Sequence, residues 1–233
     1  MWSLSPAETE ALVLSLKVAF WSVIASLPLG VALAFLLSRW DFPGKSLVDA
    51  IVHLPLVLPP VVVGYFLLVV MGRRGAIGAF LEETLGITFA FRWTGAALAC
   101  AVMGLPLLVR AIRQSLDAVD RGLEAAAATL GASPPWVFAS VTLPLILPGI
   151  LTGMLLSFAR SLGEFGATIT FVSNIPGETQ TLPLAIYTFT QVPGGDAQAL
   201  RLCIISIVLS LLALMASEFL LRRANVRAAG RDA

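Results

Sequence analysis

Five long apolar runs constrain this chain more than any other feature of its sequence. They cover roughly residues 12–38, 47–71, 93–114, 145–172 and 200–222. A helix that crosses the hydrocarbon core of a bilayer needs about 20 apolar residues, so each run is long enough to span a membrane. Charged residues make up 12% of the chain, whereas soluble domains contain about one quarter. The sequence therefore predicts an all-α integral membrane protein with about five transmembrane helices, and six, with an added N-terminal or re-entrant segment, as the alternative.

Glycines and prolines interrupt these runs. The fourth run is longer than one span requires, so we expect a helix followed by a broken segment. Prolines recur within the runs, at Pro28, Pro55, Pro59, Pro60, Pro106 and Pro148. Each lacks an N–H and leaves a carbonyl unpaired, which lipid tolerates where protein or a water-filled cavity covers the break. The proline pattern favours the wall of a translocation path, with ordinary kinked packing as the alternative. About five helices in one chain are too few to enclose a gated path, which predicts a homodimer with the path on its two-fold axis.

The positions of Lys and Arg predict the orientation of the chain, because cytoplasmic loops are enriched in both. The tail, the region 110–121 and the first loop carry Arg222, Arg223, Arg227, Arg231, Arg110, Arg113, Arg121, Arg39 and Lys45. The loop 173–199 carries none. We therefore expect a cytoplasmic C-terminus and, with five spans, an N-terminus outside. The loop 72–92 conflicts with this rule, since it places Arg73, Arg74 and Arg92 on the predicted outer side.

The segment from Leu123 to Pro144 is too polar and too interrupted to cross a bilayer, although it lies between two apolar runs. Residues 125–130 favour a helix, and Gly131 can adopt the left-handed conformation that ends one. Ser133 suits the N-cap and Pro134 the first position of a second short helix. That helix carries Trp136, Val137 and Phe138. Large apolar side chains on a short cytoplasmic loop indicate a docking surface for another protein.

This loop resembles the cytoplasmic signature of ABC importer permeases, which reads EAA, three residues, Gly, nine residues, Ile, any residue, Leu-Pro. Nine residues after Gly131 the chain continues with Val141, Thr142, Leu143 and Pro144. Counting back puts the signature Glu at Ala125, so Glu124 stands one place early, and one residue turns a helical side chain by about 100°. The ion-pairing role of that Glu is thereby put in question, while the small face at Ala126 and Ala127 is kept. The resemblance implies a coupling element, within about residues 116–143, made by Glu124, Ala126, Gly131, Trp136, Phe138, Leu143 and Pro144.

Much of the remaining chain is similar to the molybdate permease subunits of ABC importers. The similar segments are HLPLVLPPVVVGYFLLVVMGRRG (53–75), GITFAFRWTGAALACAVM (86–103) and FARSLGEFGATITFVSNIPGETQTLP (158–183). The resemblance implies the type I permease fold, one transmembrane domain over residues 1–233 without a regulatory domain, and import of molybdate, with tungstate or sulfate as alternatives. It also implies a bacterial inner membrane location, and as partners a second copy, two ATPase subunits that hold ATP and Mg, and an external binding protein. No cofactor is then expected on this chain itself.

Ionisable and small residues recur inside the fourth run, where charge is costly. Arg160 and Glu164 are four residues apart and can pair on one helical face. A free carboxylate would repel an oxyanion, so we predict that Glu164 is paired, with Arg160 or across the dimer, and helps to hold a gate. Hydroxyls can bind an oxyanion and glycines allow close approach, which gives the candidate gate residues Arg160, Ser161, Gly163, Glu164, Gly166, Thr168 and Thr170. A purely structural ion pair is the alternative.

Other residue types give little indication of chemistry. Cys100 and Cys203 lie within apolar runs and are expected to be inert thiols, and the lone His53 is expected to pack rather than bind a metal. The net charge of +1, with no basic run, does not indicate nucleic acid. No GxxxxGK[ST] sequence is present, so we assign ATP hydrolysis to a partner and do not expect an enzyme. A secondary transporter that works alone, with coupling-ion sites near the midplane, is the competing function.

Overall fold

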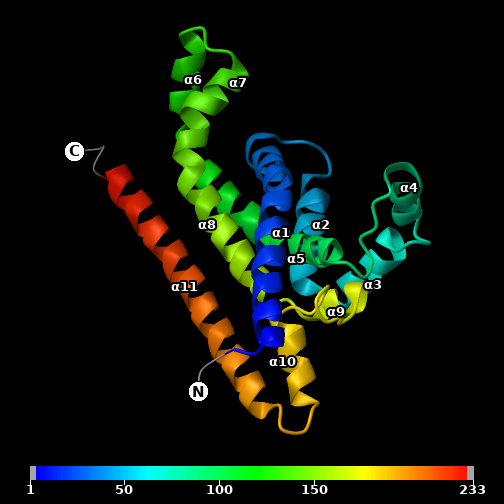
Figure 1. The fold of residues 1–233 in the computed structure, drawn as a ribbon. Helices are drawn as coiled ribbons and strands as arrows, with labels where there is room; N and C mark the ends of the chain where they lie inside the picture. The colour runs from blue at the N-terminus through cyan, green and yellow to red at the C-terminus, as the bar shows by residue number, and fades with distance from the viewer. Residues whose placement is uncertain (1–3, 230–233) are drawn as a thin grey trace.

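The computed structural model describes residues 4–229, with side chains described for residues 4–219, and every regular element in that range is helical. Four helices are long and apolar enough to cross a membrane: α1 (Pro6–Arg39), α5 (Trp93–Asp117), α8 (Leu143–Leu162) with its leading turns, and α11 (Asp196–Ala229). Shorter elements are α2 (Lys45–Val57), α3 (Pro60–Met71), α4 (Ala76–Leu85), α6 (Arg121–Thr129), α7 (Pro134–Val137), the π-helical turn η1 (Phe138–Thr142), α9 (Gly166–Val172) and α10 (Leu182–Thr190). Together they form an elongated bundle (Figure 1). The prediction of an all-α membrane protein is confirmed.

The run 47–71 forms two helices rather than the single span expected from its length. The axes of α2 and α3 differ by 114°. Pro59 and Pro60 supply no N–H to continue the α2 hydrogen bonds, and Leu58, which precedes them, is extended (φ −70°, ψ 143°). The prolines expected to interrupt the apolar runs do so here at Pro59 and Pro60. In the fourth run the expected break is confirmed, since α8 ends at Leu162 and α9 begins at Gly166.

Side-chain contacts fix the relative directions of the spans. Lys17, near the start of α1, lies 3.7 Å from the ring centre of Trp93 at the start of α5. Ser38, near the end of α1, donates a hydrogen bond to Asp117 at the end of α5. Because α1 and α5 are parallel, the bent pair α2–α3 returns the chain across the bundle and counts as one broken span. The loop 72–92 then lies on the side where α1 begins.

The start of α11 lies on that same side. Arg201 near its start contacts Glu8 near the start of α1, at 2.9 Å, and the Glu8 side chain is fully buried. Among the described residues, four helices are long and apolar enough to span a membrane singly, and the bent pair α2–α3 brings the number to five when it is counted as one span. The tail arginines on which the orientation rule relied, Arg222, Arg223, Arg227 and Arg231, lie outside the residues whose side chains the structure describes.

Helix α5 is the centre of the bundle and positions α8. Its face from Ala96 to Leu116 is buried against α1 and α8. At the contact with α8, a Cβ on Gly104 would overlap Ser157, and one on Gly149 would overlap Ser115. Small residues at these crossings let the backbones approach closely, as is common in membrane bundles. The two ends of α8, which carry the candidate site residues, are therefore held against a tightly packed core.

Candidate functional site

The predicted site residues lie in two regions at opposite ends of α8. The first, which we call the elbow, covers residues 116–143 and includes α6, α7 and η1. The second, which we call the broken segment, covers residues 160–172 and includes α9. Figure 1 shows α6 and α7 at the far tip of the structure, beyond the ends of α1 and α11.

The elbow folds through one helix cap and one glycine turn. The Asp120 carboxylate accepts a hydrogen bond from the Gly122 N–H at 2.8 Å, so α6 starts at Arg121 and not at Ala125 as its composition suggested. Gly131 has φ +86°, which confirms the predicted left-handed turn. Ser133 is the N-cap of α7, although its hydroxyl makes no capping bond, and the proline that follows begins the helix.

The tip of the elbow exposes large apolar side chains. Leu130 is 89% exposed, Trp136 is 61% exposed and Leu123 is 50% exposed. Trp136 is placed as the sequence predicted for a docking residue. Leu130 was missed, because a leucine at the end of a short helix reads as an ordinary helix former. Burying such a side chain in a partner is worth about 1.5–3 kcal/mol, so two or three of them provide a substantial anchor.

Phe138 does not belong to this exposed tip. Its ring packs edge to face on Phe35 of α1, with 5.5 Å between the ring centres, and Val137 beside it is buried. The expectation that Trp136, Val137 and Phe138 face outward together is corrected for the last two. One turn of helix carries both an exposed and an inward face, and sequence order alone did not separate them.

Glu124 anchors the elbow to the bundle. Its Oε1 lies 3.0 Å from Nη2 of Arg39, at the end of α1, and accepts a hydrogen bond from the Thr142 hydroxyl at 2.7 Å. The Arg39 side chain is 9% exposed and that of Glu124 is 22% exposed. The neighbouring Ala125 is exposed. Glu124 thus makes an ion pair within the chain. Its position one residue before the signature Glu had put that role in question.

The remaining elbow residues shape the entry into α8. Ala126 is exposed, and its carbonyl accepts the Thr129 hydroxyl at 2.8 Å. Leu143 packs on the apolar core around α5, and Pro144 is exposed in the first turn of α8. Pro144 has no N–H for the carbonyl of Ser140, which is consistent with the π-helical turn that precedes it. The elbow and α8 therefore form one continuous helical path from Pro134 to Leu162.

In the broken segment, Glu164 joins the end of α8 to the start of α9. Its Oε2 lies 2.7 Å from Nη1 of Arg160, and its Oε1 accepts the Ala167 N–H at 2.8 Å. The Glu164 side chain is 1% exposed and that of Arg160 is 28% exposed. The predicted pairing within the chain is thus present. One carboxylate closes the gap between two helices, because it satisfies both a cation on α8 and a free N–H of α9.

The hydroxyls in this region donate to backbone carbonyls. Ser161 donates to Ser157 O at 2.8 Å and also contacts Ser22 Oγ on α1 at 3.0 Å. Thr168 donates to Phe165 O at 2.9 Å, and Thr170 donates to Gly166 O at 2.8 Å. In this conformation their donors are used within the chain, so an oxyanion would need a rearrangement before it could bind there.

The two predicted gate glycines differ in their surroundings. A Cβ on Gly166 would lie 2.8 Å from Pro60 Cβ, at the start of α3, whereas Gly163 has open space around it. Across the same contact, a Cβ on Gly64 would lie 2.5 Å from the Ala167 carbonyl oxygen. Glycine is thus required on both sides where α3 meets α9. Sequence reasoning missed Gly64, although its place in an apolar run next to prolines was a usable signal.

The two regions are mechanically connected. The exposed tip is joined to α1 through Arg39 and Glu124 and continues into α8 through η1, and α8 ends at the Glu164 junction with α9. The exposed tip and the contact between α9 and α3 are thus linked through α8 and two ion pairs.

Comparison with known proteins agrees with this geometry. Residues 26–226 match the family described as binding-protein-dependent transport system inner membrane component. The chain is 61% identical over 225 residues to the molybdenum transport system permease protein ModB of Escherichia coli (strain K12), covering 97% of this chain and 98% of that protein. It is 59% identical over 216 residues to the protein of the same name from Haemophilus influenzae, covering 93% and 94%. A sulfate transport system permease protein, CysW of Synechococcus elongatus, is 40% identical over 177 residues, covering 76% and 62%.

Two solved structures share the arrangement of helices. One is a bacterial alginate ABC transporter in complex with alginate pentasaccharide-bound periplasmic protein, with a TM-score of 0.72 and 18% identity over 94% of this chain and 80% of that chain. The other is the methionine ABC transporter MetNI in an inward-facing conformation, with a TM-score of 0.67 and 19% identity over 96% and 97%. At this level of identity the likeness concerns the fold alone.

Proposed function

We infer that this chain, which belongs to the family of binding-protein-dependent transport system inner membrane components, is the permease subunit of an ATP-driven importer of molybdate. It is a component of a transporter and not a catalyst. The two relatives named for molybdenum transport are 61% and 59% identical to it, and the sulfate relative is 40% identical. This order favours molybdate, with sulfate as the second candidate and tungstate, an oxyanion of the same charge and shape, as the third.

The main support for the proposal is the elbow. Its tip exposes large apolar side chains, and the Arg39–Glu124 ion pair holds it to α1. Leu130 and Trp136 have no covering partner within residues 4–219, although they are large apolar groups. We assign their covering to a cleft on an ATPase subunit. Movement of that subunit on binding and hydrolysing ATP would then turn the elbow, and Arg39 and the η1 turn would pass the motion to α1 and α8.

The permease would work as a homodimer with the path on the two-fold axis. Helix α3 is a candidate for the dimer contact, since Tyr65 and Phe66 are each more than half exposed and so are free to face lipid or a second copy. The contact of α3 with α9, pinned by Gly64 and Gly166, is the part of the path that we assign to the gate. The paired Glu164 would hold α9 in place without presenting a free carboxylate to an oxyanion.

The full transporter that follows from this proposal has two copies of this chain, two ATPase subunits that hold ATP and Mg, and an external binding protein that delivers the ion. It would lie in a bacterial inner membrane with the elbow and the C-terminus on the cytoplasmic side. Nucleic acid has no role in it. A secondary transporter working alone leaves the elbow without a purpose, and within the described residues the buried carboxylates of Glu8 and Glu164 are both paired with arginines.

Reconstitution tests the proposal. The chain is assembled in liposomes with an ATPase subunit and a binding protein of the proposed transporter, and ATP turnover and ion uptake are measured with molybdate, tungstate and sulfate. We expect ATP-dependent uptake, with turnover stimulated most by molybdate-loaded binding protein. Uptake driven by an ion gradient without ATP would contradict the proposal, and stimulation by sulfate alone would replace molybdate with the second candidate.

A further inference from the structure

The two arginines that break the orientation rule lie together in a compact turn. Arg73 and Arg74 stand between Gly72 and Gly75, directly after α3, on the side of the bundle where α1 begins. The Gly75 N–H bonds to Gly72 O at 2.8 Å, and a Cβ on either glycine would overlap backbone carbonyl oxygens of α3. Glycine is therefore required at both ends of the turn, which presents two guanidinium groups from a constrained backbone.

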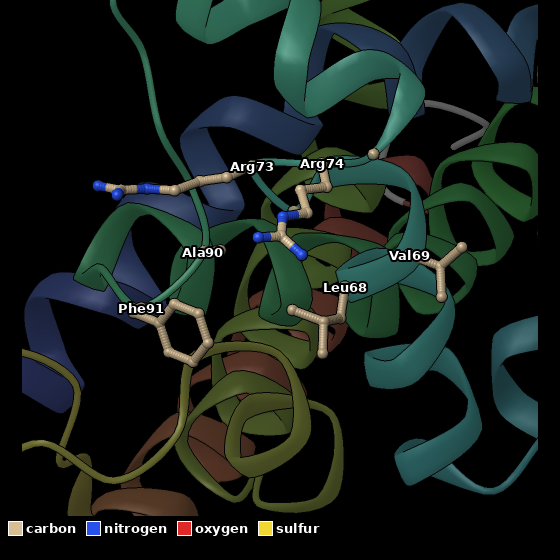
Figure 2. Close-up of a pocket in the computed structure, with 8 residues that line it drawn as sticks. Leu68, Val69, Arg73, Arg74, Ala90 and Phe91 are labelled. Atoms are coloured by element: carbon tan, nitrogen blue, oxygen red, sulfur yellow. The ribbon is translucent and has the colours of Figure 1, made fainter.

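These arginines border a pocket with an apolar floor. The cavity has a volume of about 340 Å³ and is formed by the end of α3, the glycine turn and the chain just before α5, with Leu68, Val69, Ala90 and Phe91 as apolar lining. In Figure 2 the Arg74 side chain points toward Leu68 and Phe91, whereas the Arg73 side chain extends away from the Arg74 guanidinium. One water molecule takes up about 30 Å³ of liquid volume. The pocket thus accommodates a polyatomic ion with part of its hydration.

The charge in this pocket is largely unneutralised. Among the described residues, Arg74 has no carboxylate within ion-pair distance, and Arg73 has one exposed contact with Glu82 at 3.7 Å. Cations that follow a helix also offset its dipole. That role does not account for Phe91, which is held at φ +60° with its ring half exposed on the pocket wall. Such a conformation is strained for a bulky residue and marks positions that the surroundings impose.

The pocket adjoins the segment assigned above to the gate. Leu68 and Ala90 on its floor pack in the same apolar cluster as Phe171 and Val172 of α9. We propose that the Arg73–Arg74 pocket binds a tetrahedral oxyanion at the outer end of the α3–α9 contact. The Arg74 guanidinium presents a planar fork of N–H donors that matches such oxygens, and Arg73 adds a second positive charge beside the pocket. The identification of this ion as cargo awaiting the gate rests on the proposed function, and the same chemistry also fits the phosphate of a lipid headgroup.

Binding to the permease–ATPase complex without the binding protein tests the site. The complex is placed in nanodiscs of zwitterionic lipid, and molybdate and sulfate are titrated by calorimetry. We expect saturable binding that is at least tenfold weaker in the double variant Arg73→Gln/Arg74→Gln. The matched control is Arg92→Gln, because Arg92 is exposed on the same loop but does not line the pocket. Equal affinity in the double variant, or equal loss in the control, would overturn the proposal.

A second arm separates the two sources of the oxyanion. The nanodiscs are prepared with phosphatidylglycerol, and the lipid retained on the protein is measured by native mass spectrometry. Retention that depends on Arg73 and Arg74 and displaces molybdate assigns the site to a headgroup, whereas molybdate binding unaffected by the lipid assigns it to the free ion. Absence of both kinds of binding in the unaltered complex would refute the site. Coupled uptake by the unaltered transporter is measured in parallel, so that failure of the site and failure of the proposed function are told apart.

Discussion

The Glu124–Arg39 ion pair is proposed to couple the elbow to α1. Replacing the Glu124 carboxylate with an amide, in Glu124→Gln, tests that role. In Glu124→Gln the side chain keeps its length, and its carbonyl oxygen can still accept the Thr142 hydroxyl, which now lies 2.7 Å from Glu124 Oε1. What is lost is the charge that faces Arg39 at 3.0 Å. The variant therefore isolates the ionic anchor of the elbow from its packing.

The expected cost follows from the burial of the pair. A hydrogen bond to a charged group contributes about 1.5–3 kcal/mol, and an exposed ion pair contributes about 0–1 kcal/mol. Arg39 is 9% exposed and Glu124 is 22% exposed, so the pair lies between these cases. We expect Glu124→Gln to loosen the elbow by about 1–2 kcal/mol, which is roughly a five- to thirtyfold shift toward an undocked elbow.

The assay is the number of ions imported per ATP hydrolysed by the reconstituted transporter. Glu124→Gln should lower this ratio while the complex still assembles and hydrolyses ATP, and a double-mutant cycle with Arg39→Gln should give a coupling energy of about 1–2 kcal/mol in thermal unfolding. Lys45→Gln is the control, because it removes an exposed ion pair with Asp41 at the same end of the bundle. An unchanged ratio together with no coupling energy would refute the role of this link.

Three further substitutions test the elbow tip and the broken segment. Gly131→Val should uncouple or disassemble the complex without unfolding the spans, because a β-branched residue disfavours φ +86°, and normal transport would contradict this. Trp136→Ala should weaken ATPase binding in a pull-down without changing thermal stability. Phe138→Ala should instead lower the thermal stability of the permease, because its ring packs on Phe35. The reverse pattern would be evidence against Trp136 as the docking residue and Phe138 as the packing residue. Glu164→Gln should alter basal ATP turnover, because it weakens the link to Arg160 while the Ala167 N–H keeps an acceptor, and unchanged basal and stimulated turnover would remove Glu164 from the mechanism.

The features that the sequence predicted well are those set by local chemistry. Gly131 adopts the left-handed turn because few other residues can, and Pro134 starts a helix because its φ is already suitable. The apolar runs form helices because a helix satisfies its own backbone hydrogen bonds, which a chain in lipid requires. The pairing of Glu164 with Arg160 was one of the two pairings predicted, but Glu164 lies beyond the end of α8 at Leu162, so the two residues do not share a helical face as the spacing suggested.

The features that it missed depend on distant segments. Arg39 and Glu124 are 85 positions apart in the sequence, and the residues around each of them do not indicate that the two form an ion pair. The inward turn of Phe138 depends on Phe35 of another helix. The 114° bend between α2 and α3 had a local signal in Pro59 and Pro60, but the sequence does not give the angle, since α3 also packs against α9. Predicting these features would require knowing which helices are neighbours.

Docking of the elbow on an ATPase at the cytoplasmic face can be measured by labelling a single cysteine placed at the elbow tip. Trp136→Cys is introduced into a chain whose Cys100 and Cys203 are replaced by Ala, and a membrane-impermeant maleimide is applied to inverted and right-side-out vesicles. We expect labelling from the cytoplasmic side and protection when the ATPase subunits are present. Labelling from the outer side, or equal labelling with and without the ATPase, would contradict it.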